Sequence, residues 1–267
     1  MKAPTSKNTL PTCRLRHTNI LLTALLIGFA CQCTAMAQGA SEFISIFDGQ
    51  TLNGWSLSHP EAARDWFVQD GYLIGKTNSR GSYLIYDGNR NIADFELKLT
   101  YRFPGKGNSG INIRAKKDST GKRSFQAYHV DLGHLGIGKN VLGAWDFHTP
   151  GRTEHRCFRG DDLTIQRDDS PKILPLEGAL EAKDIHKNHW NQVHVVVRGN
   201  RFEFSINGKP ASRFVELLPT SLRLHSGMIQ LQLHDPGMAV HFKDIQLKIC
   251  LLYTSPSPRD VEESRMT

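Results

Sequence analysis

The sequence predicts an all-β protein, a β-sandwich of two antiparallel sheets in a single domain. Short segments in which apolar and polar residues alternate recur at hairpin spacing, and helical periodicity is almost absent. Turn signals such as Asp70-Gly71 and Asn207-Gly208 separate neighbouring segments. Because each such strand has one apolar face, two sheets must bury these faces against each other.

The segments with the clearest alternation are residues 43–47, 66–75 as a hairpin, 83–86, 95–102, 108–131 as a second hairpin, 190–198, 202–206, 228–234 and 240–249. With weaker segments they predict about eleven or twelve strands. Alternation fades over residues 132–189, where we expect at most a short helix within residues 173–189. A stretch this long without regular strands predicts functional loops beside a cleft.

The first 37 residues have the features of a secretory signal. Residues 2–16 carry four basic side chains and no acidic one, residues 20–30 are apolar, and Ala35-Met36-Ala37 is a small-x-small cleavage site. The apolar run is shorter than the roughly 20 residues that span a bilayer. We therefore expect a periplasmic or secreted protein cleaved near Ala37, with lipidation at Cys31 as the weaker alternative.

The last segment, residues 250–267, has no strand period and contains two prolines. It resembles a translated sequencing adapter, so we predict a non-native, disordered tail; a natural disordered tail is the alternative. The predicted domain is then residues 38–249. The chain's formal charge of +7 is mild and does not indicate nucleic-acid binding. The single cysteine of this domain, Cys157, is expected to be a buried small hydrophobe.

The hairpin at Asn108–Asp131 predicts a polar sheet face. Asn112 and Arg114 alternate with apolar residues before the turn, and we place Gln126 and Tyr128 beside them on the same face. Planar amide and guanidinium groups with an aromatic ring are the groups that bind sugars. The period places His129 and Asp131 in phase with each other and away from this face.

Four stretches together resemble the 3-keto-disaccharide hydrolase domain family. They are FDGQTLNGW, NSGINIR, WNQVHVVVRGNRFEFSING and MIQLQLHDPGMAVHFKDIQLK, and the resemblance covers about residues 43–249. It implies a concanavalin-A-like jelly-roll fold and an enzyme that cleaves glycosides oxidised at C3 of the sugar. The chain departs from the family pattern at residues 124–131 and at residues 143–146, where Trp145 stands in place of a tyrosine and Asp146 retains the acid.

A ketone at C3 acidifies the C2 proton, so the bond to the leaving group can break by elimination, followed by addition of water. This chemistry needs a base, a donor to the ketone oxygen and an acid for the leaving group. We expect His234 as base or acid, Asp146 with His148 as an acid/base pair on the long loop, and Arg114 as the donor. The expected substrate-binding residues are Asn108, Asn112, Gln126, Tyr128, Trp145 and Gln232.

Two other classes of function remain as alternatives. One is a non-catalytic lectin-like module that binds glycans on the same face, with Trp145 as a stacking platform; the weaker one is an interaction domain. We expect no cofactor and no metal site, although histidines and acids between residues 129 and 155 leave a divalent metal as an alternative. The expected partners are a glycoside or oligosaccharide substrate and a sugar 3-oxidoreductase of the same pathway, with no nucleic acid and no membrane span.

Overall fold

The structure is a computed structural model, and it describes residues 42–250. The predicted signal at residues 1–37 lies outside these residues, as does the predicted tail at residues 250–267 except for Cys250, so both stay predictions. Within the described range no helix is long and apolar enough to cross a membrane. The helical elements of residues 42–250 are three short 3₁₀ turns, η1 (Pro60–Arg64), η2 (Ala182–Asp184) and η3 (Thr220–Leu222).

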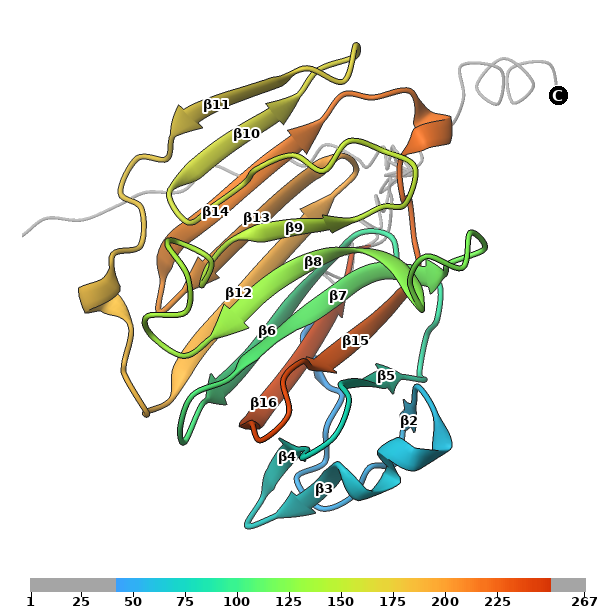
Figure 1. Cartoon of the computed structure of the whole chain (residues 1–267), viewed down its shortest axis with the longest axis vertical. Helices are drawn as coiled ribbons and strands as arrows, with labels where there is room; N and C mark the ends of the chain where they lie inside the picture. Colours follow the sequence, from blue (N-terminus) through green and yellow to red (C-terminus); the bar gives the residue numbers. More distant parts are fainter. Residues whose placement is uncertain (1–41, 251–267) are drawn as a thin grey trace, which may run out of the picture. The chain divides into compact units, whose positions relative to one another are not determined.

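The strands form two sheets (Figure 1). The ten-stranded sheet has, in spatial order, β11 (Pro171–Pro175), β10 (Asp161–Ile165), β14 (Lys209–Glu216), β13 (Arg201–Ile206), β12 (Asn191–Arg198), β6 (Phe95–Arg102), β16 (Ala239–Ile249), β4 (Tyr72–Lys76) and β3 (Trp66–Gln69), with β1 (Ile44–Ser45) also on β16. The six-stranded sheet has β2 (Trp55–Leu57), β5 (Ser82–Tyr86), β15 (Met228–Leu233), β7 (Asn108–Lys117), β8 (Phe125–Gly133) and β9 (Trp145–His148). All pairings are antiparallel except β10 with β14.

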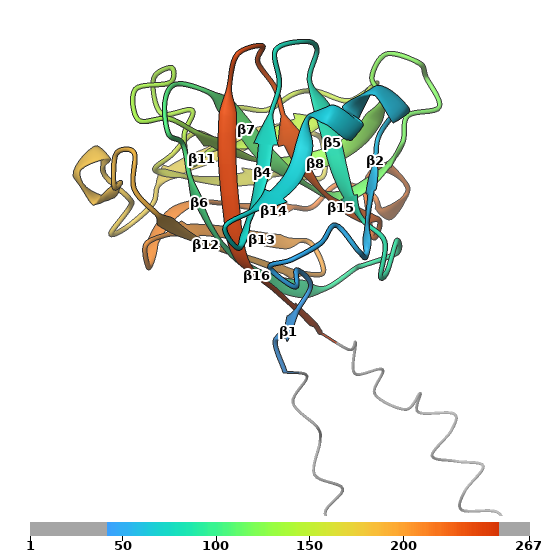
Figure 2. The same ribbon diagram turned by 90° about the horizontal axis from the view of Figure 1, so that it is seen from below.

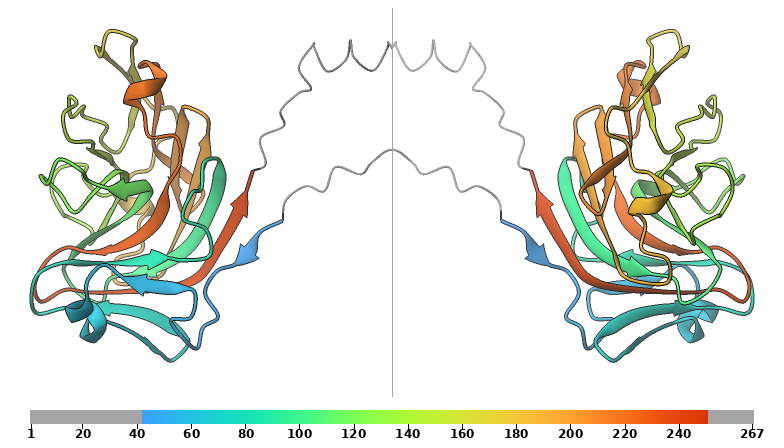
Figure 3. Two further views of the ribbon diagram at one scale, coloured as in Figure 1. Left: turned by 90° about the vertical axis from the view of Figure 1, so that its right-hand side faces the viewer. Right: turned by 90° about the vertical axis from the view of Figure 1, so that its left-hand side faces the viewer.

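The core lies between the two sheets, which Figure 3 shows from two sides. The ten-stranded sheet contributes fully buried side chains such as Phe95 and Leu97, and the six-stranded sheet contributes Ile111 and Leu231. Cys157 is buried beside this core, as predicted. The predicted fold class, an all-β jelly-roll sandwich, is confirmed.

The expectation that residues 132–189 hold no regular strands is wrong. β9, β10 and β11 lie in this range, and β2 and β14 were also missed. β9 has only four residues, and the edge strand β11 begins and ends with proline and is largely exposed. Strands this short or this exposed have too few buried positions to show a period of two. The single-turn η2 agrees with the short helix expected within residues 173–189.

The two ends of the described chain lie side by side (Figure 2). Ile44 of β1 pairs with Leu247 of β16. The backbone N–H of Cys250 donates to the carbonyl oxygen of Asp94 at 2.9 Å, so regular hydrogen bonding extends one residue beyond the predicted domain end at Ile249.

Candidate active site

The outer face of the six-stranded sheet carries a row of polar side chains from five adjacent strands. Cross-strand pairing sets Gln230 opposite Asn112, Asn112 opposite His129, and His129 opposite Asp146. Residues directly across from each other on neighbouring strands point to the same face of a sheet, and so do residues two positions apart along one strand. We call this set the polar floor; it consists of Tyr83, Asn112, His129, Asp131, Asp146, His148, Gln230 and Gln232.

A chain of hydrogen bonds orients the buried imidazole of His129. Asn112 Nδ2 donates to Gln230 Oε1 at 2.9 Å. This leaves Asn112 Oδ1 to accept from His129 Nδ1 at 2.7 Å. With its proton on Nδ1, His129 presents Nε2 as an acceptor, and this atom lies 3.6 Å from Asp131 Oδ1.

Gly110 makes room for this imidazole. A Cβ atom at position 110 would lie 2.2 Å from His129 Nε2 and 2.4 Å from the carbonyl oxygen of Val130. Contacts this short do not occur between non-bonded heavy atoms, so only glycine lets His129 lean across β7 toward Asp131.

The expected pair of Asp146 and His148 is present, but it lies on strand β9 and not on a loop. His148 Nε2 donates to Asp146 Oδ2 at 2.9 Å. The imidazole of His148 stacks on that of His129, with ring centroids 4.7 Å apart and an interplanar angle of 19°. Glu154, which sequence analysis did not single out, forms a side-chain hydrogen bond with Asp146.

The carboxyl groups of the floor differ in protonation. Burial, together with the negative charge of Asp146, raises the pKa of Asp131 to about 8. For Asp146, hydrogen bonds with His148 and Glu154 outweigh burial and lower the pKa of its carboxyl group. The hydrogen bond with Asp146, and then burial, raise the pKa of Glu154. Near neutral pH the floor therefore holds one protonated and one ionised aspartate.

The imidazole of His129 is buried and lies against that of His148. Burial, and then the neighbouring His148, lower the pKa of His129 well below its usual value. His129 is therefore a neutral imidazole at neutral pH, and its Nε2 lone pair is available to accept a proton or a hydrogen bond.

Three of the predicted substrate-binding residues lie on or next to the floor. Asn108, Asn112 and Gln232 share the outward direction of β7 and β15. Among the described residues, no hydrogen-bond partner is found for three buried atoms at this face, namely Asn108 Oδ1, Gln230 Nε2 and Gln232 Oε1. Unpaired buried polar atoms are costly, so these atoms are suited to hydroxyl groups of a bound sugar.

His234 lies just beyond the end of β15, at the rim of the floor. Its side chain is half exposed, and Nδ1 is 2.7 Å from Asp235 Oδ1. It is close enough for its charge to help lower the pKa of His129.

The predicted placement of Arg114 on the polar face is wrong. A register shift interrupts the β7–β8 pairing between Ile113 and Lys116, and Arg114 has a positive φ of 48°. This bulge turns the side chain into the sandwich, where its guanidinium pairs with Asp94 at 3.0 Å and lies over the ring of Phe202. Arg114 is buried there, away from the floor.

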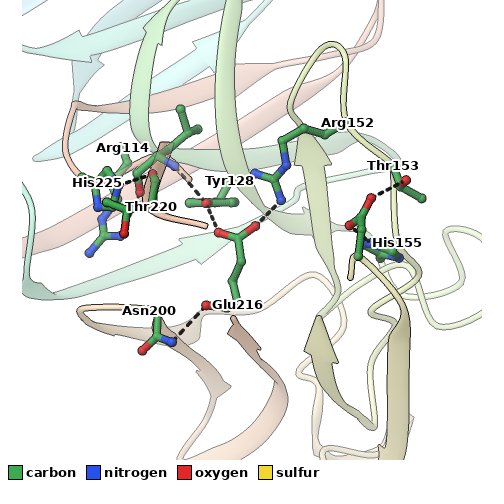
Figure 4. Close-up of polar contacts among 11 residues, drawn as sticks. Arg114, Tyr128, Arg152, Thr153, His155, Asn200, Glu216, Thr220 and His225 are labelled. Atoms are coloured by element: carbon green, nitrogen blue, oxygen red, sulfur yellow. Dashed lines mark hydrogen bonds and ion pairs between the residues drawn. The ribbon is translucent and has the colours of Figure 1, made fainter. Parts of the chain in front are cut away.

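Tyr128 and Gln126 are also not on the floor. Tyr128 is buried in the core, where its hydroxyl donates to Glu216, which also pairs with Arg152 (Figure 4). The same hydroxyl accepts from the backbone N–H of Leu224 at 3.1 Å. Gln126, two residues before Tyr128 in β8, points to the same side of the sheet. A tyrosine satisfies its hydroxyl inside a core when a partner is present, and Glu216 is that partner.

Trp145 is a core residue and not a stacking platform. It is 2% exposed, and its ring packs edge-on against Phe214 at 5.2 Å. The alternation in β9 sends Trp145 and Phe147 inward, while Asp146 and His148 face outward.

The expectation that His129 and Asp131 lie away from the polar face is also wrong. They are in phase with each other and out of phase with Tyr128, as predicted, but Tyr128 is the residue that faces inward. The signal that could have identified them is the pairing of Asn112 with a histidine across the hairpin, which the bulge after Ile113 conceals.

A cleft of about 390 Å³ adjoins the floor. It lies between the start of β5 and the β7–β8 turn, and its lining includes Arg80, Tyr83, Lys117, Arg123 and Phe125. Gln232 Nε2 donates to the Tyr83 hydroxyl at 3.3 Å. The cleft and the floor thus meet at one hydrogen-bonded pair.

Over residues 42–250, no group of three or more histidine, cysteine, aspartate or glutamate side chains is arranged so that it could hold a metal ion.

Solved structures share this fold. A protein from Parabacteroides distasonis, provisionally named a glycosyl hydrolase, is 17% identical, with a TM-score of 0.52 over 78% of this chain and 94% of that chain. A second one from the same organism is 15% identical, with a TM-score of 0.50 over 78% of this chain and all of that chain. At these identities the likeness concerns the fold.

A family model identifies the family, and a sequence relative matches part of the chain. A 3-keto-disaccharide hydrolase from Bacteroides thetaiotaomicron is 29% identical over 34% of this chain, and the match spans 35% of that protein's length. The model of the 3-keto-alpha-glucoside-1,2-lyase-like domain matches residues 42–248, nearly the whole described range. The chain therefore belongs to the 3-keto-alpha-glucoside-1,2-lyase-like domain family.

Proposed function

We propose that this protein is an exported, glycosidase-type enzyme that cleaves the glycosidic bond of 3-keto-glycosides or 3-keto-disaccharides on the polar floor. The observation that carries the proposal is the pair of aspartates on one sheet face, one with a raised and one with a lowered pKa, beside two histidines. Two titratable groups whose pKa values are shifted in opposite directions serve as acid and base in the same site. The family and its named relative point to the same bond.

The proposed reaction is an elimination followed by hydration. A base removes the C2 proton, the electron pair forms a C1=C2 double bond, and the C1–O bond to the leaving group breaks. The leaving oxygen takes a proton from an acid. Water then adds across the double bond, with hydroxide at C1 and a proton at C2, and yields the free 3-keto sugar.

The floor offers a group for each proton transfer. His148, held through Nε2 by ionised Asp146, has Nδ1 free to act as the base. Protonated Asp131 is the acid for the leaving oxygen. His129 Nε2, 3.6 Å from Asp131 Oδ1, lies next to that carboxyl group and is the relay for returning its proton.

The test is incubation of the purified full chain with 3-keto-trehalose. We expect release of 3-keto-glucose, and losses of about 100-fold or more in kcat/KM for His148→Ala and Asp131→Asn, the usual scale for an acid or base. In D2O the released sugar should carry deuterium at C2, above the exchange of free 3-keto-glucose incubated for the same time. Absence of release by the wild type contradicts the activity, and release without this deuterium contradicts elimination.

Export and a partner enzyme belong to the same proposal. The signal-like residues 1–37 support a periplasmic or secreted location. A 3-keto sugar arises by oxidation of a C3 hydroxyl, so a sugar 3-oxidoreductase must supply the substrate. Fractionation of cells expressing the full chain tests the location; recovery in the cytoplasm at full length contradicts export.

A lectin-like module is the second candidate function. The aromatic rings of Tyr83 and Phe125, with centroids 5.6 Å apart at the cleft, support sugar binding without catalysis. Binding of an unoxidised disaccharide as tightly as its 3-keto form, with no turnover of the latter, favours the module.

A further inference from the structure

We propose that the 390 Å³ cleft is the subsite for the leaving group, and that it selects a leaving group carrying a carboxylate or sulfate. This inference rests on the proposed function, because it assigns the part of the substrate that lies beyond the cleaved bond.

The cleft has an excess of positive charge. Its lining holds Arg80, Lys117 and Arg123, against a single carboxylate, that of Asp118. Asp118 is committed to its own turn, since its two oxygens accept from the backbone N–H groups of Thr120 and Arg123 at 2.8 and 2.9 Å. The three cations of the cleft are exposed and outnumber its one carboxylate.

Two of these cations form no ion pair within residues 42–250. Neither Lys117 nor Arg123 has a carboxylate within ion-pair distance, whereas Arg80 is 3.5 Å from Glu61 with both side chains mostly exposed. An exposed ion pair such as that of Arg80 with Glu61 contributes little free energy. A guanidinium without a partner can bind a carboxylate or sulfate through two parallel hydrogen bonds.

Arg123 joins the cleft to the acid/base groups. It lines the cleft, and its positive charge contributes to lowering the pKa of His129 and opposes the rise in the pKa of Glu154. Ionised Asp146 would repel an anion placed over the floor. The charge distribution thus orients the substrate, with its uncharged keto ring over the floor and its anionic group at Arg123.

The walls of the cleft suit a ring next to the anion. The ring of Phe125 lies edge-on to that of Tyr83, with centroids 5.6 Å apart, and Lys117 Nζ lies over the Phe125 ring, 5.7 Å from its centroid. Aromatic walls bind flat apolar faces. An aryl leaving group with a para anion is therefore a suitable probe.

The experiment compares 3-keto-glucosides of 4-hydroxybenzoate, 4-hydroxybenzenesulfonate and 4-hydroxybenzamide as substrates of the full chain. The first two carry an anion, and the amide is a neutral compound of the same shape. We expect KM for at least one anionic substrate to be about tenfold lower than for the amide, and this preference to fall in 0.5 M salt. The carboxylate and sulfonate arms separate the two anion types.

Arg123→Gln should remove the preference, so that its KM values for the anionic substrates and for the amide agree within about twofold. Lys122→Gln is the matched control, because Lys122 is the preceding residue of the same turn and does not line the cleft. Equal KM values of the wild type for all three substrates, or equal effects of the Arg123→Gln and Lys122→Gln substitutions, overturn the inference and leave the proposed function intact.

A second measurement does not depend on catalysis. Calorimetry of the full chain with unoxidised 4-carboxyphenyl glucoside and its carboxamide tests the cleft even if no 3-keto substrate is turned over. Tighter binding of the carboxylate, lost in Arg123→Gln, supports the anion subsite; equal binding of both ligands overturns it.

Discussion

Asp131 and Asp146 share one sheet face yet differ in protonation because their surroundings differ. Asp131 is largely buried, and no hydrogen bond satisfies its charge among the described residues. Asp146 is a third exposed and is held by His148. An enzyme needs such a difference to have an acid and a base at one pH.

Replacing Asp131 tests this difference through stability. Its pKa is about 8 in the folded protein and about 3.9 in an unfolded chain. As pH rises through this window, the unfolded state loses its proton while the folded state retains it, so Asp131 destabilises the fold increasingly toward pH 8. Urea unfolding should show Asp131→Asn more stable than the wild type by about 1–3 kcal/mol at pH 8, and by less at pH 5.

The same substitution should abolish most activity, since the amide cannot donate the proton. In the wild type, kcat/KM should fall as pH rises through about 8. A stability difference that is the same at pH 5 and pH 8 would contradict the raised pKa.

Gly110 gives a second prediction at the scale of one residue. In Gly110→Ala the new methyl group would meet His129 Nε2 and the backbone of Val130, so the imidazole must move. We expect a loss of about 1–3 kcal/mol from overpacking and at least a tenfold lower kcat/KM. Gly105→Ala is the control, because a Cβ there has no neighbour within 4 Å; equal losses in both variants would contradict the role of Gly110.

The bulge in β7 decides which side chains the hairpin presents. It keeps Asn112 on the outer face and turns Arg114 inward two residues later. Arg114 then donates to the carbonyl oxygens of Ala93 and Leu224 as well as to Asp94. In β7, the buried ion pair of Arg114 with Asp94 fixes the residue at which the alternation of inward and outward side chains stops.

Removal of Arg114 should therefore destabilise the protein and not act through the floor. Arg114→Ala leaves Asp94 buried without its partner, which costs about 3–5 kcal/mol. Arg114→Gly should be less destabilised, by about 1 kcal/mol, because glycine accepts the positive φ of 48° at lower cost than alanine. Chemical denaturation of both variants measures this; an Arg114→Ala variant of wild-type stability would argue against the buried pair.

The two sheets are joined across the core by a polar cluster. Tyr128 comes from the six-stranded sheet, Glu216 from the ten-stranded sheet, and Arg152 from the loop after β9. The backbone N–H of Leu224 adds a fourth contact, on the tyrosine hydroxyl. Burial, and then Glu216, raise the pKa of this tyrosine, so it remains a hydrogen-bond donor at neutral pH.

Glu216→Ala should reduce the free energy of unfolding by about 3 kcal/mol, because Arg152, whose side chain is only 11% exposed, is left without a counter-charge. Tyr128→Phe removes only a hydroxyl and should cost about 1–2 kcal/mol. The control is Glu203→Ala on the exposed side of β13, which should stay within 0.5 kcal/mol of the wild type. Similar losses for Glu216→Ala and Glu203→Ala would show that the cluster does not hold the sheets together.

The sequence by itself determined the sandwich, the long strands β6, β7, β8, β12 and β16, and the pairing of Asp146 with His148. These follow from period-two alternation and from i, i+2 spacing, which are local properties. It also placed Asn112 and Gln232 correctly. Only the tertiary structure decided which other residues lie on the same sheet face as Asn112 and Gln232. The inward turn of Arg114 depends on Asp94, 20 residues away, and the burial of Tyr128 depends on Glu216, 88 residues away. Because a one-residue shift in a strand reverses every side chain beyond it, contacts of that range brought His129 and Asp131 onto the floor.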